Sequence, residues 1–426
     1  MSLKSAIQNN LLLKISSLTS VGVAIRMLLS FATQKIIAVF LGPAGVAHLG
    51  NFRNLIPIIQ SLSTFGIFEG VIKYVAEFKE DEKELQKLFS TSFVFVLSGS
   101  LLVFLVLFFG AFSLNNWLFS GQYDFVFVFK ILSVATPFIA INALFNAIIN
   151  GLSKYKQFVA LNILSYVVSA FLMGLLVYYE NLNGALFALA ITPILQFFFL
   201  FYLYFRVLRS YVNFKNISFQ IPYAQQFLPF VLMSLVATFL SSFVEINLRR
   251  SLVLEIDEMN AGNWTAMTYI SNQYFAFTAG IFTLYVLPKF ASLHTNRQFQ
   301  KEVLGIYKTI LPLFAFGLSL LFFCREWVIL ILQSDAFLGM KTLFKWQLLG
   351  DFVKMASLII SHQFLAKKMV KEFIITELIS LLLFFGLASF FLKTHGAEGI
   401  VFAHFIRYVL YFLAVVFALR KFLFGK

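Results

Sequence analysis

The chain has 426 residues, of which 60% are hydrophobic, 18% aromatic and only 12% charged, and its formal net charge is +14. A soluble domain carries about 25% charged residues, so this composition excludes a water-soluble globular enzyme. The apolar runs, such as 93–109 and 379–391, are continuous rather than alternating in polarity. They therefore also exclude an outer-membrane barrel, whose strands alternate lipid-facing and lumen-facing residues.

Apolar spans follow one another in chain order, and each is long enough for a transmembrane helix of about 20 residues. We expect them at 11–40, 46–72, 89–112, 126–150, 158–179, 185–205, 227–250, 265–288, 303–323, 346–366, 373–392 and 398–419. The longest connection lies at the chain midpoint, as in transporters built from two halves. The sequence thus predicts an all-α polytopic membrane protein with about 12 transmembrane helices. We expect six-helix lobes at 1–205 and 227–426, joined by a cytoplasmic linker at 206–226.

The distribution of Lys and Arg predicts the orientation. An even number of spans places both termini on one side of the membrane, where the connections carry 20 Lys and Arg residues against 7 on the opposite side. Because cytoplasmic connections carry the excess of positive charge, we expect both termini to be cytoplasmic. This topology also accounts for most of the net charge, so we expect no nucleic-acid partner.

Motifs of catalysis and cofactor binding are absent from the sequence. Cys324 is the single cysteine, the histidines form no H-E-x-x-H pattern, and no GxxxxGK[ST] phosphate loop is present. Metal sites and nucleotide-driven transport depend on such patterns. We therefore expect no enzymatic activity, no catalytic residue, no metal site and no cofactor, with H⁺ or Na⁺ coupling as an open option.

Polar faces on two spans carry functional information, because a charge at the centre of a span costs about 2.5–3.5 kcal/mol and normally faces a partner or water. Both faces repeat at three- and four-residue steps: Thr19, Gly22, Arg26, Ser30 and Thr33 in the first span, and Ser234, Thr238, Ser241, Glu245 and Arg249 in the seventh. We expect Arg26 to line a central cavity between the lobes. For Arg249, cavity lining and snorkelling to the outer interface both stay open, and Ser and Thr also serve to join helices.

The tenth span holds a second polar cluster, with Gln347, Gly350, Asp351 and Lys354. The three-residue spacing of Asp351 and Lys354 allows an intrahelical ion pair. Such a pair either neutralises two buried charges or leaves Asp351 to couple an ion, and both interpretations stay open. Further candidates are the bases Arg53, Lys73 and Arg407, the acids Glu69, Glu245 and Glu377, and the amide Asn146, for which helix packing and sugar contact are equally good explanations.

Charges embedded in the spans indicate the class of substrate. The embedded cations outnumber the embedded acids: Arg26, Lys35, Arg53, Arg249, Lys354 and Arg407 stand against Glu245, Asp351 and Glu377. A central cationic cavity favours an anion, and guanidinium groups suit bidentate contact with phosphate or carboxylate. A transporter for hydrophobic cations would show the reverse balance.

Five short stretches make the sequence resemble the Wzx-type flippases of the multidrug/oligosaccharidyl-lipid/polysaccharide exporter superfamily. They are LGPAG at 41–45, NFRN at 51–54, GIFEGVIKYVA at 66–76, FKWQLLGDFVK at 344–354 and HGAEG at 395–399. The nearest branch resembles the flippases of the lipid-linked enterobacterial common antigen repeat. By matching motif, this branch keeps Arg53, Lys73, Arg249, Asp351 and Lys354, whereas Glu69 departs from its pattern.

The resemblance implies a flippase that moves an undecaprenyl-diphosphate-linked oligosaccharide, of O-antigen or common-antigen type, across the bacterial inner membrane. Movement from the cytoplasmic to the periplasmic leaflet by alternating access is expected. The partners implied are this lipid-linked sugar and the lipid bilayer, and polysaccharide polymerase and chain-length machinery are further candidates. From the embedded charges and the matching motifs together, we expect the substrate to be bound by the cations Arg26, Arg53, Arg249, Lys354 and Arg407. Asp351, Glu245 and Glu377 are candidates for ion coupling.

Two other functions remain as alternatives. A drug/cation antiporter of the same superfamily would share the fold, but its cavity should be acidic and aromatic. A membrane glycosyltransferase or polymerase acting on lipid-linked sugars needs a sizeable outer domain or loop for its catalytic acids. The longest expected outer connections, 251–264 and 324–345, are short.

Overall fold

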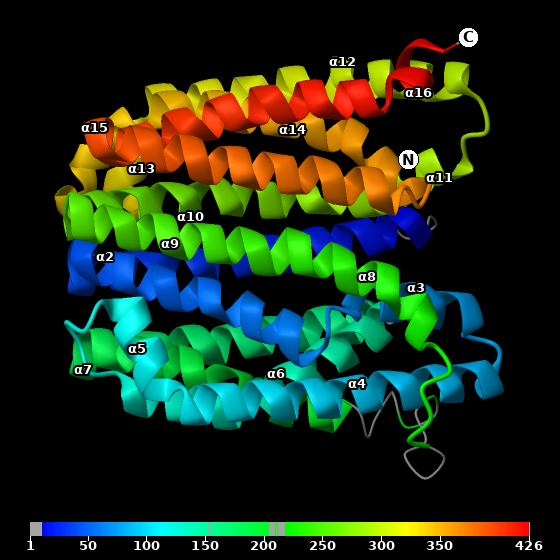
Figure 1. The fold of residues 1–426 in the computed structure, drawn as a ribbon, viewed down its shortest axis with the longest axis horizontal. Coiled ribbons are helices and arrows are strands. Elements are labelled where there is room, and N and C mark those ends of the chain that lie inside the picture. Colours follow the sequence, from blue (N-terminus) through cyan, green and yellow to red (C-terminus); the bar gives the residue numbers. More distant parts are fainter. Residues whose placement is uncertain (1–10, 153–154, 204–208, 210, 212–217, 426) are drawn as a thin grey trace. The chain divides into compact units, whose positions relative to one another are not determined.

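The computed structural model describes residues 11–152, 155–203, 209, 211 and 218–425, and these residues form helices and connections without any strand (Figure 1). The elements are α2 (Leu11–Ser63), α3 (Phe68–Phe78), α4 (Glu82–Phe109), α5 (Ala111–Phe119), α6 (Val126–Gly151), α7 (Tyr155–Leu203), α8 (Ala224–Ser234), the π-helix η3 (Leu235–Leu240), α9 (Ser241–Glu255), α10 (Glu258–Ile281), the π-helix η4 (Phe282–Val286), α11 (Leu287–Ser292), α12 (Asn296–Phe323), α13 (Arg325–Leu332), the 3₁₀ helix η5 (Asp335–Thr342), α14 (Phe344–Ala366), α15 (Val370–Ala418) and α16 (Arg420–Phe424). The expectation of an all-α protein is confirmed for the described residues.

The long element α2 is a hairpin of two helices. Gly42 interrupts it with a left-handed backbone, at φ 62°. The guanidinium of Arg53 donates to the side-chain oxygen of Gln34 at 2.9 Å. In a continuous helix these two residues would lie about 28 Å apart at about 1.5 Å per residue, so the chain must reverse between them. A glycine tolerates this conformation without the steric cost that a Cβ would add.

The elements α7 and α15 reverse in the same way. Asn181 and Gly396 adopt positive φ angles of 49° and 54°. A Cβ at residue 184 would lie 1.9 Å from the carbonyl oxygen of residue 176, and one at residue 399 would lie 2.3 Å from that of residue 391. The helices on either side of each reversal therefore correspond to the spans expected at 158–179 and 185–205, and at 373–392 and 398–419.

Side-chain caps explain where two of the helices begin. The carboxylate of Asp81 accepts hydrogen bonds from the backbone amides of Lys83 and Glu84, both at 3.1 Å, at the start of α4. At the start of α12, Thr295 and Gln298 form a reciprocal capping box. These contacts satisfy amide groups that have no partner inside the helix.

The chain forms two compact units. Unit 1 comprises Met1–Phe40 and Phe52–Ser242, and unit 2 comprises Leu41–Asn51 and Phe243–Lys426. Two short segments therefore differ from the lobes expected from the sequence. Segment 41–51 belongs to unit 2 with the C-terminal half, and segment 227–242 belongs to unit 1 with the N-terminal half. The lobe boundaries expected from the sequence stay a prediction.

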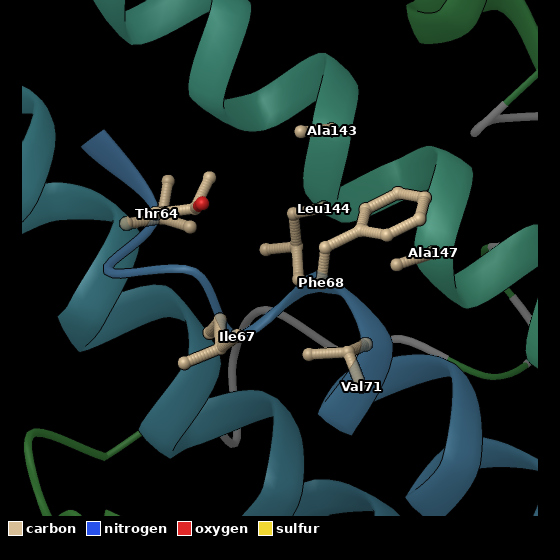
Figure 2. A pocket seen from close by; sticks show the side chains of 8 residues that line it. Thr64, Ile67, Phe68, Val71, Ala143, Leu144 and Ala147 are labelled. Carbon is tan, nitrogen blue, oxygen red and sulfur yellow. The ribbon is translucent and has the colours of Figure 1, made fainter. Parts of the chain in front are cut away.

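Each unit has its own apolar core. In unit 1 the core joins α3, α4 and α6 and includes Val71, Phe89 and Ile148. A narrow apolar cleft beside it is lined by residues of the same unit: Thr64, Ile67, Phe68, Val71, Val96, Ala143, Leu144 and Ala147 (Figure 2). In unit 2 the core joins α12, α14 and α15, with Phe299 and Ile359 fully buried.

The end of the expected linker packs against α4. Of residues 206–226, only 209, 211 and 218–226 are described, and the others lie outside the described residues. The amide of Tyr223 donates to the hydroxyl of Thr91 at 3.2 Å, and its phenol donates to the carboxylate of Glu84 at 2.5 Å. Burial and the nearby Glu84 raise the pKa of Tyr223. This segment is therefore fixed to unit 1.

The helix surfaces are apolar. Eight helices in the described part of the chain are long and apolar enough to cross a membrane. Large side chains remain open on them: Phe109 of α4 is 78% exposed and Phe323 of α12 is 80% exposed. Apolar surface of this extent is stable against lipid and unfavourable in water. The chain is therefore a multi-pass membrane protein.

Candidate functional site

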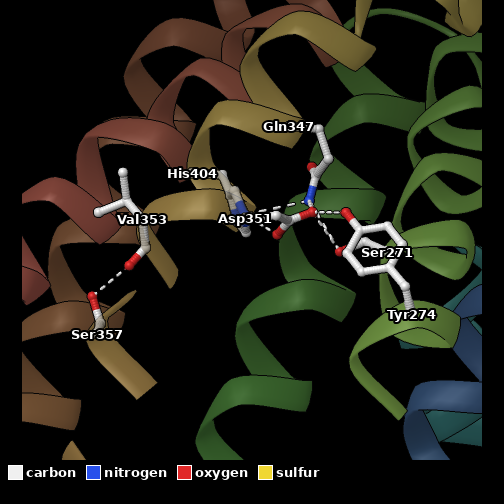
Figure 3. A network of polar contacts seen from close by, with 7 residues as sticks. All are labelled: Ser271, Tyr274, Gln347, Asp351, Val353, Ser357 and His404. Atoms are coloured by element: carbon white, nitrogen blue, oxygen red, sulfur yellow. Dashed lines mark hydrogen bonds and ion pairs between the residues drawn. The ribbon is translucent and has the colours of Figure 1, made fainter. Parts of the chain in front are cut away.

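A buried carboxylate lies at the centre of a network of polar contacts in unit 2. Asp351 of α14 is 0% exposed. Its Oδ2 accepts hydrogen bonds from the Ser271 hydroxyl at 2.7 Å, from the Gln347 amide at 3.1 Å and from the Tyr274 hydroxyl. Its Oδ1 lies 2.9 Å from Nε2 of His404. These five residues, the Asp351 cluster, come from α10, α14 and α15 (Figure 3).

Gly350 brings the histidine within reach of this carboxylate. A Cβ at this position would lie 2.4 Å from Cδ2 of His404 and 3.1 Å from Cα of Phe405. Only a glycine therefore lets α14 approach α15 so closely. The glycine and the aspartate of the FKWQLLGDFVK motif thus act together, one permitting the close packing and the other using it.

Two cations beside the Asp351 cluster, Lys354 and Arg407, both make cation–π contacts with the ring of Tyr408. The ammonium of Lys354 lies 5.5 Å from the ring centre of Tyr408, and the guanidinium of Arg407 lies 4.9 Å from the same ring. Arg407 also donates from Nε to the Ser380 hydroxyl at 2.8 Å. The ring of Tyr408 contacts the ring of His404, with the two centres 4.8 Å apart. The cations and the cluster are therefore neighbours within one unit.

Asp351 and Lys354 do not form the intrahelical ion pair that their spacing allows. The carboxylate of Asp351 contacts Nε2 of His404 instead, at 2.9 Å. The ammonium of Lys354 lies instead over the ring of Phe275, 4.1 Å from its centre. Hydroxyl and amide donors already satisfy the carboxylate, so it needs no lysine.

The other two candidates for ion coupling, Glu377 and Glu245, lie in unit 2. Glu377 of α15 is half-buried and accepts a hydrogen bond from the Tyr411 hydroxyl at 2.7 Å. Tyr411 lies near Tyr408, with ring centres 6.1 Å apart, so Glu377 belongs to the same polar neighbourhood as Arg407. Glu245 is half-buried on α9, one helical turn before Arg249.

Arg249 does not snorkel to a surface, because its side chain is only 1% exposed. Its Nε donates to the Thr265 hydroxyl at 2.7 Å, and its Nη1 donates to the side-chain oxygen of Asn51 at 3.1 Å. Its guanidinium also lies 5.1 Å from the ring centre of Trp264. This arginine therefore joins α9 and α10 to the segment 41–51.

Close packing and a polar contact hold the same segment in unit 2. A Cβ at Gly262 would lie 2.1 Å from the carbonyl oxygen of Pro43, so α10 touches the backbone of the 41–51 segment directly. His48, whose side chain is 3% exposed, lies 3.0 Å from the carboxylate of Glu258. The LGPAG motif thus has a structural role within unit 2.

The cationic candidates of unit 1 are more open than Arg249. Arg26 is exposed, and its guanidinium lies 5.1 Å from the ring centre of Tyr166. Arg53 is half-buried and holds Gln34 across the α2 hairpin. Lys73 is half-buried, with its ammonium 4.5 Å from the ring centre of Tyr74.

The asparagine stripe of α6 contributes to helix packing. Asn142 donates to the backbone oxygen of Pro193 at 2.8 Å, which joins α6 to α7. The side-chain oxygens of Asn142 and Asn146 are buried and have no hydrogen-bond partner among the described residues. Asn146 therefore retains one unused acceptor in unit 1.

The structure assembles a site from residues that sequence reasoning treated separately. It brings Gln347, Asp351, Lys354, Glu377 and Arg407 into one region of unit 2. Arg26, Arg53 and Lys73 lie in unit 1, and each has its own aromatic or amide contact.

Sequence reasoning missed His404, Ser271 and Tyr274. One signal was available for the histidine, because His404, Arg407, Tyr408 and Tyr411 recur at three- and four-residue steps and share a helical face. Ser271 and Tyr274 show no comparable pattern.

Sequence comparison finds relatives over almost the whole chain. Residues 12–294 match the family described as polysaccharide biosynthesis protein. The chain is 29% identical over 406 residues to a protein named Lipid III flippase from Escherichia coli (strain K12), covering 94% of this chain and 96% of that protein. A protein of the same name from Shigella flexneri gives the same values. The resemblance inferred from the five motifs is therefore confirmed.

Structural comparison shows the fold of MOP superfamily transporters. An inward-facing multidrug resistance MATE family transporter of that superfamily matches with a TM-score of 0.78 at 15% identity, covering 93% of this chain and 95% of that one. The lipid II flippase MurJ, in an inward closed conformation, matches with a TM-score of 0.67 at 16% identity, covering 95% of this chain and 87% of that one. The family match spans well over half of the sequence. The chain therefore belongs to the polysaccharide biosynthesis protein family.

Proposed function

We propose that this protein is a flippase for an undecaprenyl-diphosphate-linked oligosaccharide of the common-antigen or O-antigen type. The observation that carries the proposal is its end-to-end similarity to two proteins named Lipid III flippase. The substrate has a charged, hydrated head that cannot cross about 30 Å of hydrocarbon unaided. It therefore needs polar protein groups along its path.

The embedded cations are the groups that bind the diphosphate. In unit 2, Lys354 and Arg407 lie on the ring of Tyr408 within 5.5 Å and 4.9 Å of its centre. Arg26 of unit 1 is exposed and available to a ligand. Arg53 and Lys73 are weaker candidates, since Arg53 already holds Gln34. The burial and hydrogen bonds of Arg249 support a structural contribution more strongly than direct substrate contact.

The movement itself is alternating access in the bacterial inner membrane, with both termini cytoplasmic and the sugar moving to the periplasmic leaflet. The excess of Lys and Arg in the connections on the side of the termini supports this orientation. Polysaccharide polymerase and chain-length proteins are the partners that receive the product. Asp351, Glu245 and Glu377 are the carboxylates available for ion coupling.

Purified protein in liposomes with a labelled lipid-linked oligosaccharide tests the function. We expect the label to become accessible on the opposite leaflet without sugar transfer or polymer growth. Lys354→Gln and Arg407→Gln should each reduce the rate by about tenfold or more, since a hydrogen bond to a charged group contributes about 1.5–3 kcal/mol. Lys371→Gln, an exposed cation outside this region, is the matched control. Polymer growth, or transport of a hydrophobic cation in place of the lipid-linked sugar, would contradict the proposal.

Cysteine labelling tests the orientation. In a Cys324→Ala background, a cysteine at Ser218 should react only with reagents on the cytoplasmic side, and one at Ser120 only from outside. Both residues lie in connections between helices. Labelling of Ser218→Cys from outside would reverse the topology and with it the direction of transport.

A further inference from the structure

His404 carries a ring nitrogen that the Asp351 cluster leaves unused. Its Nε2 lies 2.9 Å from Oδ1 of Asp351 and 3.3 Å from the amide nitrogen of Gln347. That amide already donates to Oδ2 of Asp351, and an ionised carboxylate can only accept, so we assign the hydrogen of the neutral ring to Nε2. In the neutral ring Nδ1 is then an acceptor, and it has no hydrogen bond among the described residues. The side chain is 13% exposed, so the ring is not sealed from its surroundings. Nδ1 is thus an unprotonated nitrogen that can accept a proton, on a ring that contacts the carboxylate of Asp351.

We propose that His404 is a proton-binding site, and that a proton on its Nδ1 strengthens the binding of a diphosphate at Lys354 and Arg407. The second part rests on the proposed function, because that function places the diphosphate at these two cations. The first part rests only on the geometry of the Asp351 cluster.

The charges around His404 explain the coupling. From α10, Ser271 and Tyr274 bring neutral hydroxyl groups to the carboxylate that His404 contacts. From α14, the charged groups near His404 are Asp351 and Lys354. On its own helix, α15, Arg407 is close, and Glu377 lies beyond Tyr408 and Tyr411. With a neutral imidazole these two acids and two bases balance.

A proton on His404 turns this balance into an excess of one positive charge. An anion at Lys354 and Arg407 then gains Coulomb attraction, which is strong where water is scarce. Binding linkage is reciprocal, so the bound diphosphate must equally favour the protonated histidine. The ring contact between His404 and Tyr408, whose ring the two cations share, keeps the proton and the anion within one small region.

A proton fits this site better than Na⁺. The oxygens of Asp351 already accept from two hydroxyl groups, an amide and the imidazole. A sodium ion, which needs several oxygen ligands, would have to displace these donors. A proton on Nδ1 displaces none of them, and it converts the existing hydrogen bond into an ion pair.

Histidine NMR tests the proton site without any ligand. Protein labelled with ¹⁵N in histidine side chains should show a resonance that titrates between about pH 8 and pH 5, the usual range of imidazole. This resonance should disappear in His404→Gln. His362→Gln is the matched control, because His362 also lies half-buried in unit 2 but contacts a backbone oxygen and the ring of Phe282. If the His404 resonance does not titrate, or if it shifts when Na⁺ replaces K⁺, the proton site is refuted.

Farnesyl diphosphate, a soluble isoprenoid diphosphate, tests the coupling. Wild type and His362→Gln should bind it more tightly at acidic than at neutral pH. After division by the change seen in His404→Gln, this gain in affinity should be about five-fold or more, the lower end of typical coupling between two sites. The variant corrects for titration of the ligand itself. Equal pH dependence in His404→Gln and wild type would refute the coupling.

The two experiments distinguish a failure of the proposed function from a failure of the proton site. If farnesyl diphosphate does not bind at any pH, the anion site and its coupling are wrong, while the NMR titration still decides the proton site. If His404→Gln does not fold, Asp351→Asn retains the histidine and an acceptor for its Nε2 but removes the negative charge beside the ring. The His404 resonance should then require a lower pH to titrate, since the carboxylate favours the charged ring. An unchanged midpoint in that variant would refute the pairing of the two residues.

Discussion

Arg26 and Arg249 occupy equivalent places in the sequence and opposite places in the structure. Each lies on the polar stripe of the first span of one half of the chain. Arg26 is exposed and contacts the ring of Tyr166. Arg249 is 1% exposed and donates to Thr265 and Asn51. The same pattern of residues thus produces an open cation in unit 1 and a structural tie in unit 2.

The difference shows that the position of an arginine on a polar helical face does not determine whether its charge is buried in a structural contact or exposed to a ligand. A buried guanidinium is tolerated only where its donors are satisfied, and the segment 41–51 brings Asn51 to Arg249 for that purpose. Arg26 has no such requirement, so its charge remains available to a ligand. The comparison predicts that stability depends on Arg249 and transport on Arg26.

The largest expected effect is the loss of stability in Arg249→Ala. The substitution leaves the buried acceptors of Asn51 and Thr265 without their donor and creates a cavity, at a cost of about 4 kcal/mol or more. Thermal unfolding in detergent, followed by size-exclusion chromatography, measures this. Arg26→Ala is the control and should change stability by about 0.5 kcal/mol at most. Equal stability of the two variants would remove the distinction between these arginines.

A second variant tests the packing of segment 41–51 against α10. Gly262→Ala would place a Cβ 2.1 Å from the backbone oxygen of Pro43, where no flexible side chain is available to move aside. We expect a loss of about 2 kcal/mol or more from overpacking. Gly305→Ala has nothing within 4 Å and should be neutral or slightly stabilising, because alanine favours helix. The same thermal assay compares them, and a normal melting temperature in Gly262→Ala would show that this packing is not required.

For Arg26 the expected effect is on transport. Arg26→Ala should lower flipping in liposomes by about tenfold or more, the equivalent of one lost charge-assisted contact. Arg26→Lys should recover only part of the rate, since the charge survives but the bidentate fork does not. The folded fraction serves as the control measurement. Normal transport by Arg26→Ala would assign this residue to structure and weaken the comparison at its functional end.

The smallest expected effect concerns a single neutral hydrogen bond. The Tyr307 hydroxyl of α12 donates to the backbone oxygen of Ala356 in α14 at 2.8 Å. Tyr307→Phe should cost about 1 kcal/mol, well below the cost of Arg249→Ala. Tyr179→Phe, at a tyrosine that is 69% exposed, should cost less still. A Tyr307→Phe loss as large as that of Arg249→Ala would show that charge and burial do not explain the ranking.

Much of the fold was predictable because the bilayer imposes strong local constraints. Apolar runs of the right length were visible in the sequence, and most helices fall where those runs are. The span expected at 46–72 is the exception, because a turn divides it between α2, which ends at Ser63, and α3, which begins at Phe68. Three reversals, at Gly42, Asn181 and Gly396, occur between expected spans. The extent of each unit was not predictable, because segment 41–51 packs according to contacts with Arg249, Gly262 and Glu258 that come from far along the chain.

The site was predictable only in part. Asp351, Lys354 and Arg407 were identified because charges inside apolar spans are costly and therefore conspicuous. The partner of Asp351 was not predicted. The three-residue spacing allowed an ion pair with Lys354, whereas in the structure the carboxylate contacts His404. Spacing within one helix says which residues share a face, but not which residue of another helix lies closer.

By itself, the sequence determined the class of the protein, its helical spans, the excess of embedded cations and the motifs that define its family. These follow from composition and local pattern, because the cost of placing polar groups in hydrocarbon acts on each segment separately. The tertiary structure decided what each charge does. It buried Arg249 among acceptors, left Arg26 open, and used Gly350 to bring His404 against Asp351. Those outcomes depend on which helices touch, and long-range packing within each unit, rather than any local pattern, sets those contacts.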